Sequence, residues 1–179
     1  MTIPNAITIL RILLVPPFVI YLLRGQYAGA LIIFAVAGIS DLIDGYIARR
    51  FRQQSKIGAF IDPLADKLLA GTAFVLLATE KIIPDWLAVI VISREVVIVG
   101  GLYLLSLLGA QITIAPSQTG KLNTAVQLST VCLCLLASVE SLGIPAGFDR
   151  FLEVLFLVTA VTTVISGFQY LRRGLRMVP

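Results

Sequence analysis

The sequence is poor in charged residues and contains no histidine. Only 13% of its 179 residues are charged, about half the share that is usual in a soluble domain. Apolar residues make up 58% of the chain, and no water-soluble fold of this length could bury so much apolar surface. A soluble core is therefore not expected, and lipid should be the solvent for much of the chain. Without histidine, any general base must be another residue type.

Cysteine, linkers and basic runs are also scarce. Cys132 and Cys134 are two residues apart in an apolar run, and residues at this spacing do not face each other on a helix. We expect small buried apolar side chains there, and neither a disulfide nor a metal pair. The chain has no low-complexity tract, linker or repeat, so a single domain over 1–179 is predicted. No basic run suggests a nucleic-acid partner.

Six apolar stretches have the length of about 20 residues that a membrane-spanning helix needs. The predicted fold is an all-α integral membrane bundle of six transmembrane helices, which places both termini on one side. The first stretch does not read as a signal peptide, because Arg11 lies within it and Pro16-Pro17 interrupt it. The paired prolines predict a kink or a helix end. The spans are 7–23, 27–47, 59–79, 84–108, 118–139 and 151–170.

Basic residues set the expected orientation, because they concentrate on the cytoplasmic side of membrane proteins. Seven lie in the connection between spans two and three or in the tail, against three on the opposite side. Both termini are therefore predicted to be cytoplasmic. The seven are Arg49, Arg50, Arg52, Lys56, Arg172, Arg173 and Arg176, and the three are Arg24, Lys81 and Arg150.

Four aspartates flank the basic connection. Asp41 and Asp44 are three apart at the end of one predicted helix, and Asp62 and Asp66 are four apart near the start of the next. Each pair shares a helix face, and a short connection makes the two helices antiparallel neighbours. Four converging carboxylates repel one another and suit hard cations such as Mg²⁺ or Mn²⁺. Two such ions form a clamp for attack at phosphorus. The alternative is a set of interfacial charges, with Asp62-Pro63 as a helix cap.

These residues belong to a longer pattern, D-x2-D-G-x2-A-R-x8-G-x3-D-x3-D, from position 41 to position 66. The pattern resembles the signature of the CDP-alcohol phosphatidyltransferase family, and every fixed position is filled. The resemblance implies that Asp41, Asp44 and Asp62 bind two Mg²⁺ or Mn²⁺ ions and that Asp66 completes the site. Asp66 would also take the proton from an acceptor hydroxyl, which attacks the β-phosphoryl of CDP-diacylglycerol and expels CMP.

The same resemblance assigns the remaining motif residues. Gly45, Ala48 and Gly58 would line the nucleotide, and Arg49 would hold the diphosphate. A site at the cytoplasmic ends of the second and third spans keeps the donor's acyl chains in the bilayer and its cytidine in water. The resemblance also implies a homodimer in the bacterial cytoplasmic membrane, with the active site facing the cytoplasm.

Two clusters outside the motif bear on the acceptor. Asn5, Thr8 and Arg11 recur every three residues and form a polar stripe on an apolar helix. They are similar to the N-terminal motif of the bacterial subgroup that uses glycerophosphate, with Ile7 where leucine is commoner. Capping and snorkelling at the interface are the alternative explanation. Arg94-Glu95 lies near the middle of the fourth span, as a structural ion pair or as part of a polar cavity.

A third cluster begins with Gly120-Lys121. Lys121, Thr124 and Gln127 are spaced to share a helix face, and the segment resembles the G-K-x-K-T-x-x-Q of the same subgroup. Asn123 stands where that subgroup commonly has a second lysine. Two cations in spans favour an anionic acceptor, and sn-glycerol 3-phosphate supplies a phosphate and a primary hydroxyl. Arg94 and Lys121 are the expected phosphate ligands, with Asn5, Thr8 or Arg11 closing the pocket.

Other functions stay open on the sequence. Within the family, the acceptor could be serine or an inositol phosphate. Polyprenyl transferases also place aspartate-rich motifs in membrane helices, but they have no use for the glycines and the Ala-Arg pair. A divalent-cation channel or transporter would explain the carboxylates, but not Arg49 or the adjacent glycines.

Overall fold

Six α-helices follow one another along the part of the chain that the computed structural model describes. The backbone is described for residues 3–51, 58–107, 118–143, 145 and 147–175, and side chains for 10–40, 67–101, 103–104, 118–143, 145 and 147–174. These residues contain no strand, so the predicted all-α class is confirmed for them. The helices are α1 (Ile3–Leu23), α2 (Tyr27–Phe51), α3 (Gly58–Thr79), α4 (Asp85–Leu107), α5 (Gln118–Ala137) and α6 (Phe148–Leu175), with a short 3-10 helix, Glu140–Leu142, before α6.

Each helix covers one of the six predicted apolar stretches. The shortest, α5, has 20 residues and the longest, α6, has 28. At 1.5 Å per residue, a helix of 20 residues is about 30 Å long, which is the thickness of the hydrocarbon core of a bilayer. The helix α1 continues through Pro16 and Pro17. The helix therefore does not end there, and the kink stays a prediction, because each proline removes one N–H bond and its ring crowds the carbonyl oxygen of the preceding turn.

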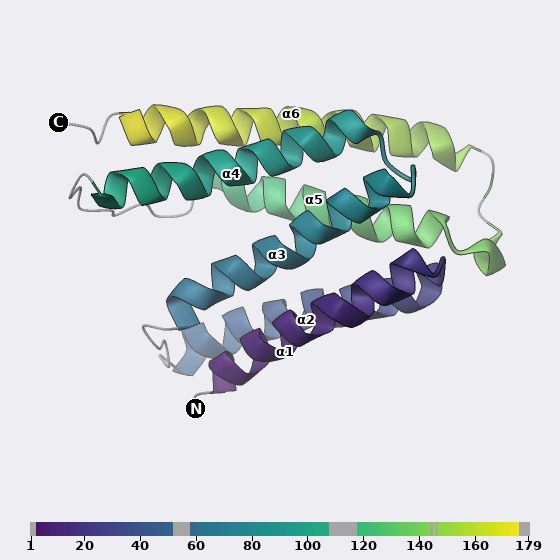
Figure 1. Ribbon diagram of the computed structural model, residues 1–179, viewed down its shortest axis with the longest axis horizontal. Coiled ribbons are helices and arrows are strands. Elements are labelled where there is room, and N and C mark those ends of the chain that lie inside the picture. Colours follow the sequence, from purple (N-terminus) through teal and green to yellow (C-terminus); the bar gives the residue numbers. More distant parts are fainter. Residues whose placement is uncertain (1–2, 52–57, 108–117, 144, 146, 176–179) are drawn as a thin grey trace.

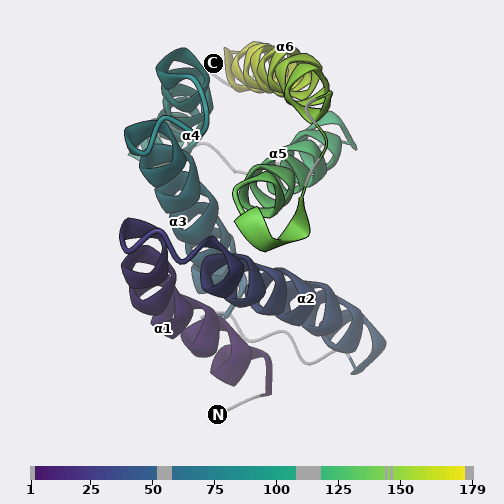
Figure 2. The same ribbon diagram turned by 90° about the vertical axis from the view of Figure 1, so that its right-hand side faces the viewer.

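The helices form two groups, which are joined by α3 and by direct packing of α2 against α5. In Figures 1 and 2, α1 and α2 lie together on one side of the molecule, and α4, α5 and α6 lie on the other. The helix α6 packs against both α4 and α5, while α3 contacts α1, α4 and α5. The helix α3, which carries Asp62 and Asp66, therefore packs against helices of both groups.

The core between the helices is apolar and close-packed. Phe18 of α1 and Phe34 of α2 are both buried, with ring centroids 5.8 Å apart in a tilted arrangement. Phe74 and Leu77 of α3 have no exposed surface. Cys134 is part of this core, and both cysteines are free thiols. The expectation of burial is confirmed for Cys134, whereas Cys132 is half-buried.

Large apolar side chains also cover the outside of all six helices. A water-soluble protein seldom exposes so continuous an apolar surface, whereas a bilayer favours it. Within the described residues, Gln118–Ala137 and Phe148–Gly174 are long and apolar enough to cross a membrane, and shorter apolar stretches lie in α1, α2 and α3. Examples of exposed residues, one from each helix in order, are Leu13, Ile32, Val75, Val96, Leu122 and Phe168.

One end of the bundle gathers the segments that carry the sequence motifs. The helices α1, α3 and α5 begin there, and α2, α4 and α6 end there, so the first and last described residues lie at the same end (Figure 1). We call this end the termini end. Because both termini lie at this end, the chain crosses the bundle an even number of times. The opposite end holds the connections from α1 to α2, α3 to α4 and α5 to α6.

Candidate active site

The four motif aspartates lie on two helices that meet the termini end of the bundle. Asp41 and Asp44 fall in the second half of α2, and Asp62 and Asp66 fall in the first half of α3. The helix α2 runs toward this end and α3 runs away from it (Figure 1). Both pairs lie on helical backbone, as their spacing predicts. Their side chains are outside the described residues, so the convergence of the four carboxylates stays a prediction.

The other motif residues share this location. Gly45, Ala48 and Arg49 belong to the last two turns of α2, and Gly58 is the first residue of α3. The roles predicted for them in nucleotide and diphosphate binding concern surroundings that lie outside the described residues. Their place on the backbone puts them within a few turns of the aspartates at the termini end.

The N-terminal stripe begins at the same end. Asn5 and Thr8 lie in the first two turns of α1, and their side chains are outside the described residues. Arg11 follows one turn later with only 3% of its surface exposed. A long cationic side chain is therefore buried on α1, which agrees with a position inside the protein better than with snorkelling toward solvent.

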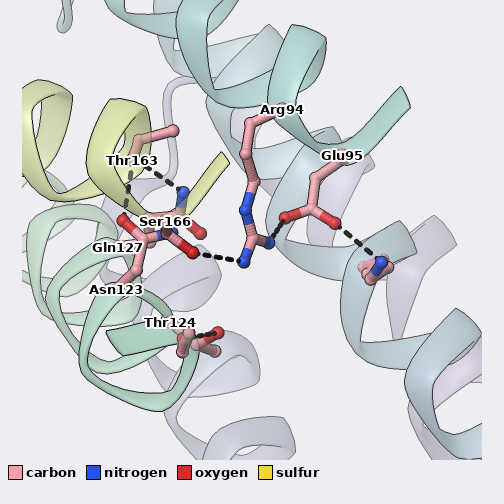
Figure 3. A network of polar contacts seen from close by, with 9 residues as sticks. Arg94, Glu95, Asn123, Thr124, Gln127, Thr163 and Ser166 are labelled. Carbon is pink, nitrogen blue, oxygen red and sulfur yellow. Dashed lines mark hydrogen bonds and ion pairs between the residues drawn. The ribbon is translucent and has the colours of Figure 1, made fainter. Parts of the chain in front are cut away.

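A cluster of charged and polar side chains surrounds Arg94 of α4. The Nη1 atom of Arg94 donates to the carboxylate of Glu95, and its Nη2 atom donates to Ser166 Oγ of α6 at 2.9 Å. The second carboxylate oxygen of Glu95 lies 3.0 Å from Lys67 Nζ of α3. Figure 3 shows this chain of contacts running from α3 through α4 to α6. The cluster thereby ties α3 to α4 and α6 through charged and polar side chains.

The cluster is largely buried and carries a net positive charge. The side chains of Lys67, Glu95 and Arg94 are 29%, 17% and 11% exposed. Two cations share one carboxylate, which leaves one positive charge uncompensated within the cluster. Among the residues whose side chains are described, the buried Nε–H of Arg94 has no hydrogen-bond partner. An anion with oxygen acceptors would satisfy both the charge and the donor.

A second polar seam joins α5 to α6. Thr130 and Thr159 bring their hydroxyl oxygens to 2.7 Å. Nearer the termini end, Gln127 Nε2 donates to Thr163 Oγ1 at 3.2 Å, and Thr163 Oγ1 donates to Asn123 Oδ1 at 2.9 Å. Asn123 is fully buried, and its Nδ2 has no hydrogen-bond partner within the described part of the chain. Figure 3 shows Thr163 of α6 in contact with both Gln127 and Asn123 of α5.

Lys121, Thr124 and Gln127 were predicted to share a helix face, but they differ in burial. Gln127 is 4% exposed and points to α6, whereas Lys121 and Thr124 are exposed. Each three-residue step falls about 60° short of a full turn, so Gln127 lies about 120° around the helix from Lys121. The hydroxyl of Thr124 donates to the carbonyl oxygen of Gly120 on its own helix at 3.1 Å.

Lys121 differs from Arg94 in its setting. It is the fourth residue of α5, at the termini end, and its side chain is exposed. The penalty for burying a cation therefore applies to Arg94 and not to Lys121. Two cations donate hydrogen bonds and accept none, so they could meet only through an anion between them. Their assignment to one phosphate stays a prediction.

Lys67 and Ser166 were not predicted as site residues. The sequence holds one signal for Ser166: Thr159, Thr163, Ser166 and Tyr170 recur at spacings of four, three and four in an apolar run. Such a stripe marks one helix face, and three of its members are buried against α5 or α4. No comparable pattern pointed to Lys67, because its partner Glu95 lies on another helix.

The described side chains contain no group of three or more His, Cys, Asp or Glu residues suited to a metal ion. The predicted ligands Asp41, Asp44, Asp62 and Asp66 do not belong to that set. As a donor set they offer carboxylate oxygens alone, which fits Mg²⁺ or Mn²⁺ and disfavours softer metals.

Comparison with known proteins places these observations in a family. Residues 1–165 match the sequence model of the CDP-alcohol phosphatidyltransferases. A CDP-diacylglycerol–glycerol-3-phosphate 3-phosphatidyltransferase from Bacillus subtilis is 33% identical over 96% of this chain and 94% of its own length. The Escherichia coli protein of the same name is 36% identical over 94% of this chain and 92% of its own.

Similarity extends to longer eukaryotic proteins. A probable cardiolipin synthase (CMP-forming) from Drosophila melanogaster is 35% identical over 95% of this chain. The human cardiolipin synthase (CMP-forming) is 34% identical over 99% of this chain. The match covers 56% of the fly protein and 63% of the human protein.

Proposed function

Because the chain belongs to the CDP-alcohol phosphatidyltransferase family, we propose that it transfers the phosphatidyl group of CDP-diacylglycerol to sn-glycerol 3-phosphate. The products are CMP and phosphatidylglycerophosphate. Two bacterial relatives that carry this activity in their names match nearly the whole of this chain and of their own. The proposal therefore concerns the full described bundle and not one segment of it.

The aspartates of α2 and α3 would hold the metal ions. Asp41, Asp44, Asp62 and Asp66 offer only carboxylate oxygens, and two divalent ions would balance their four charges. When bound, such ions stabilise the negative charge that develops on a transferring phosphoryl group. The proposal needs the four side chains to converge at the termini end, where their helical backbone lies.

The chain's own residues would then carry the transfer. Asp66 accepts the proton of the acceptor hydroxyl, and the hydroxyl oxygen forms a bond to the β-phosphorus. The bond from that phosphorus to the bridging oxygen breaks, and CMP leaves with the bridging oxygen. Arg49 holds the diphosphate, and Gly45, Ala48 and Gly58 leave room for the nucleotide against the backbone.

The proposed acceptor depends mainly on the hydrogen bonds and burial of Arg94. Its guanidinium is held from two sides by Glu95 and Ser166, and its Nε–H is buried without a partner. A fixed guanidinium with a spare donor suits a phosphate monoester. Lys121, at the start of α5, would act as a second point charge from the exposed side of the pocket, and Asn5, Thr8 or Arg11 would close it.

We propose that all six helices cross the bacterial cytoplasmic membrane. Exposed apolar side chains on every helix and helix lengths near the hydrocarbon thickness support this arrangement. The excess of basic residues supports a cytoplasmic location for the termini end. CDP-diacylglycerol then enters from the membrane, and sn-glycerol 3-phosphate enters from water. A homodimer is expected from the family resemblance.

One observation favours a second acceptor. Asn123 replaces a cation that is common in the glycerophosphate-using subgroup, and it is a neutral, fully buried amide in this chain. The fly and human relatives named as CMP-forming cardiolipin synthases match 95% and 99% of the chain. Cardiolipin carries two phosphatidyl groups on one glycerol, so the acceptor in that case is phosphatidylglycerol. Its phosphodiester bears one negative charge less than a phosphate monoester and needs fewer cations.

An acceptor panel tests both assignments. Purified protein in detergent receives CDP-diacylglycerol, Mg²⁺ and one acceptor: sn-glycerol 3-phosphate, phosphatidylglycerol, serine, inositol or inositol phosphate. We expect CMP release and a phosphatidylglycerophosphate product with the first acceptor. Cardiolipin formation from phosphatidylglycerol alone would replace that assignment with the second. A cation transporter would release no CMP with any acceptor.

A further inference from the structure

One carboxylate holds two cations from two different helices. Glu95 of α4 binds Arg94 of its own helix through one oxygen, and its other oxygen lies 3.0 Å from Lys67 Nζ of α3. The three side chains are between 11% and 29% exposed. In such surroundings each charge depends strongly on its partner, because little water is present to solvate it. Without the carboxylate, two cations would face each other.

The contact between Glu95 and Lys67 lies next to Asp66 on α3. Lys67 directly follows Asp66, and the Cα atoms of adjacent residues are about 3.8 Å apart. A restraint on Lys67 is therefore a restraint on the backbone of Asp66. One turn further along α3, a Cβ atom built at Gly71 would lie 3.4 Å from Ile92 Cδ1 of α4, so the two helices approach closely there.

We propose that Glu95 is a positioning residue, which holds Lys67 and so fixes the turn of α3 that carries Asp66. The inference rests on the proposed function, in which Asp66 takes the proton of the acceptor. A reacting group displaced by about 1 Å can cost about a hundredfold in rate. Loss of Glu95 should therefore lower kcat, because the chemical step depends on the placement of the base.

Glu95 and Arg94 should affect different kinetic constants. Arg94 contacts the acceptor phosphate in the proposed function, so its loss raises the KM for the acceptor. Glu95 acts on α3 through Lys67, so its loss lowers kcat and leaves the KM of CDP-diacylglycerol nearly unchanged. A purely structural role would lower the yield of folded protein without this division between the kinetic constants.

Kinetics of four variants test the coupling: Glu95→Gln, Glu95→Asp, Lys67→Gln and the double variant Lys67→Gln/Glu95→Gln. We expect each Gln variant to lose kcat roughly tenfold, and the double variant to be no slower than the worse single variant, since residues that act as a unit are not additive. Glu95→Asp keeps the charge and should recover part of the rate. Asp85→Asn is the matched control, because the Lys81–Asp85 pair is exposed, and it should leave kcat unchanged.

Two results overturn the inference. If Glu95→Gln slows turnover equally with and without Lys67, then Glu95 does not act through Lys67. If Lys67→Gln alone abolishes turnover while Glu95→Gln does not, then Lys67 acts by its own charge. Each comparison uses only protein that elutes as a single folded species, and Glu95→Asp supplies a charged variant should Glu95→Gln fail to fold.

A second measurement keeps the inference separate from the proposed reaction. Spin labels at Leu68→Cys and Val96→Cys, both exposed positions next to the pair, report the separation of α3 and α4 by electron paramagnetic resonance. Cys132 and Cys134 are replaced by serine in this background. We expect Glu95→Gln to shift or broaden the distance distribution, and an unchanged distribution overturns the inference. If the wild-type protein transfers to no acceptor, the proposed function fails, and the distance measurement still decides whether Glu95 holds α3.

Discussion

Arg94 of α4 donates a hydrogen bond from Nη2 to Ser166 Oγ of α6 at 2.9 Å, across 72 residues of sequence. Because Glu95 engages the neighbouring Nη1, the guanidinium is oriented before any substrate arrives. A preoriented cation loses less side-chain entropy when it binds an anion. The same arginine therefore supports the packing of α4 on α6 and, in the proposed function, the recognition of the acceptor.

Metal dependence is the first prediction. Asn at Asp41, Asp44 or Asp62 removes one anionic ligand, and metal ions supply several kcal/mol of charge stabilisation, so the rate should fall about a hundredfold or more. CMP release measured against Mg²⁺ and Mn²⁺ concentration should show a higher metal requirement in each variant. Full activity of the wild-type protein in EDTA would contradict the metal site.

Asp66→Asn should lower turnover by about a hundredfold to ten-thousandfold, the usual contribution of a positioned general base. Binding of CDP-diacylglycerol should change far less, since the base acts on the acceptor hydroxyl. Single-turnover kinetics and donor binding on the same preparation separate the two effects. Near-normal turnover in this variant would mean that another group takes the proton.

The seam between α5 and α6 gives a prediction about stability. Thr130→Val and Thr159→Val each remove one partner of the 2.7 Å contact. Hydrogen bonds between membrane helices contribute about 0.6 kcal/mol on average, so a double-mutant cycle should give a coupling energy of about that size. Ser129→Ala is the control, because this exposed hydroxyl bonds only to the carbonyl oxygen of Ala125 on its own helix. A coupling energy of zero would show that the contact does not stabilise the pair.

The sequence predicted the helices well because their signal is local. Each apolar stretch became one helix, and the motif aspartates fell on helical backbone as their spacing required. Contacts between helices were harder to predict. Periodicity alone placed Gln127 beside Lys121, whereas the structure turns Gln127 toward Thr163 of α6. Two residues about 120° apart on a helix can differ in burial when a neighbouring helix covers only one of them. Which helix lies there depends on the tertiary packing, which local periodicity does not encode.

The Lys67–Glu95 contact illustrates the same limit. Its members are 28 residues apart in the sequence and lie on helices whose relative position no local pattern encodes. The Arg94-Glu95 pair was visible because its members are adjacent in an apolar run, where charges are costly. Its bond to Ser166 was not, although the spacing of Thr159, Thr163 and Ser166 marked the receiving face of α6.

Orientation is tested by labelling. In a background without Cys132 and Cys134, a single cysteine in the connection 52–57 should resist an impermeant thiol reagent added to intact cells, because the basic excess places that connection in the cytoplasm. A cysteine at Leu142 is the matched control. It is exposed at the opposite end of the bundle, so it should react. Labelling of the first position but not of Leu142 would invert the orientation.

The acceptor provides the last prediction. Arg94 is buried, held by Glu95 and Ser166, and keeps one donor unpaired. A hydrogen bond to a charged group contributes about 1.5–3 kcal/mol, so Arg94→Gln should raise the KM for sn-glycerol 3-phosphate about tenfold to a hundredfold. Lys121 is exposed, and Lys121→Gln should raise the same KM less, since water screens its charge. The KM for CDP-diacylglycerol should stay nearly constant in both variants.

The matched control for this pair is Arg150→Gln, an exposed cation near the start of α6 at the end of the bundle opposite the site. It removes the same charge without approaching the acceptor, so both KM values should be unchanged. If Arg94→Gln lowers only the yield of folded protein, and the surviving enzyme keeps its acceptor KM, then Arg94 serves the packing of α4 on α6 alone. An unchanged acceptor KM in both Arg94→Gln and Lys121→Gln would remove the electrostatic reason for a phosphate monoester. The acceptor would then be one with less negative charge, and phosphatidylglycerol, whose use agrees with the neutral Asn123, would be the first to test.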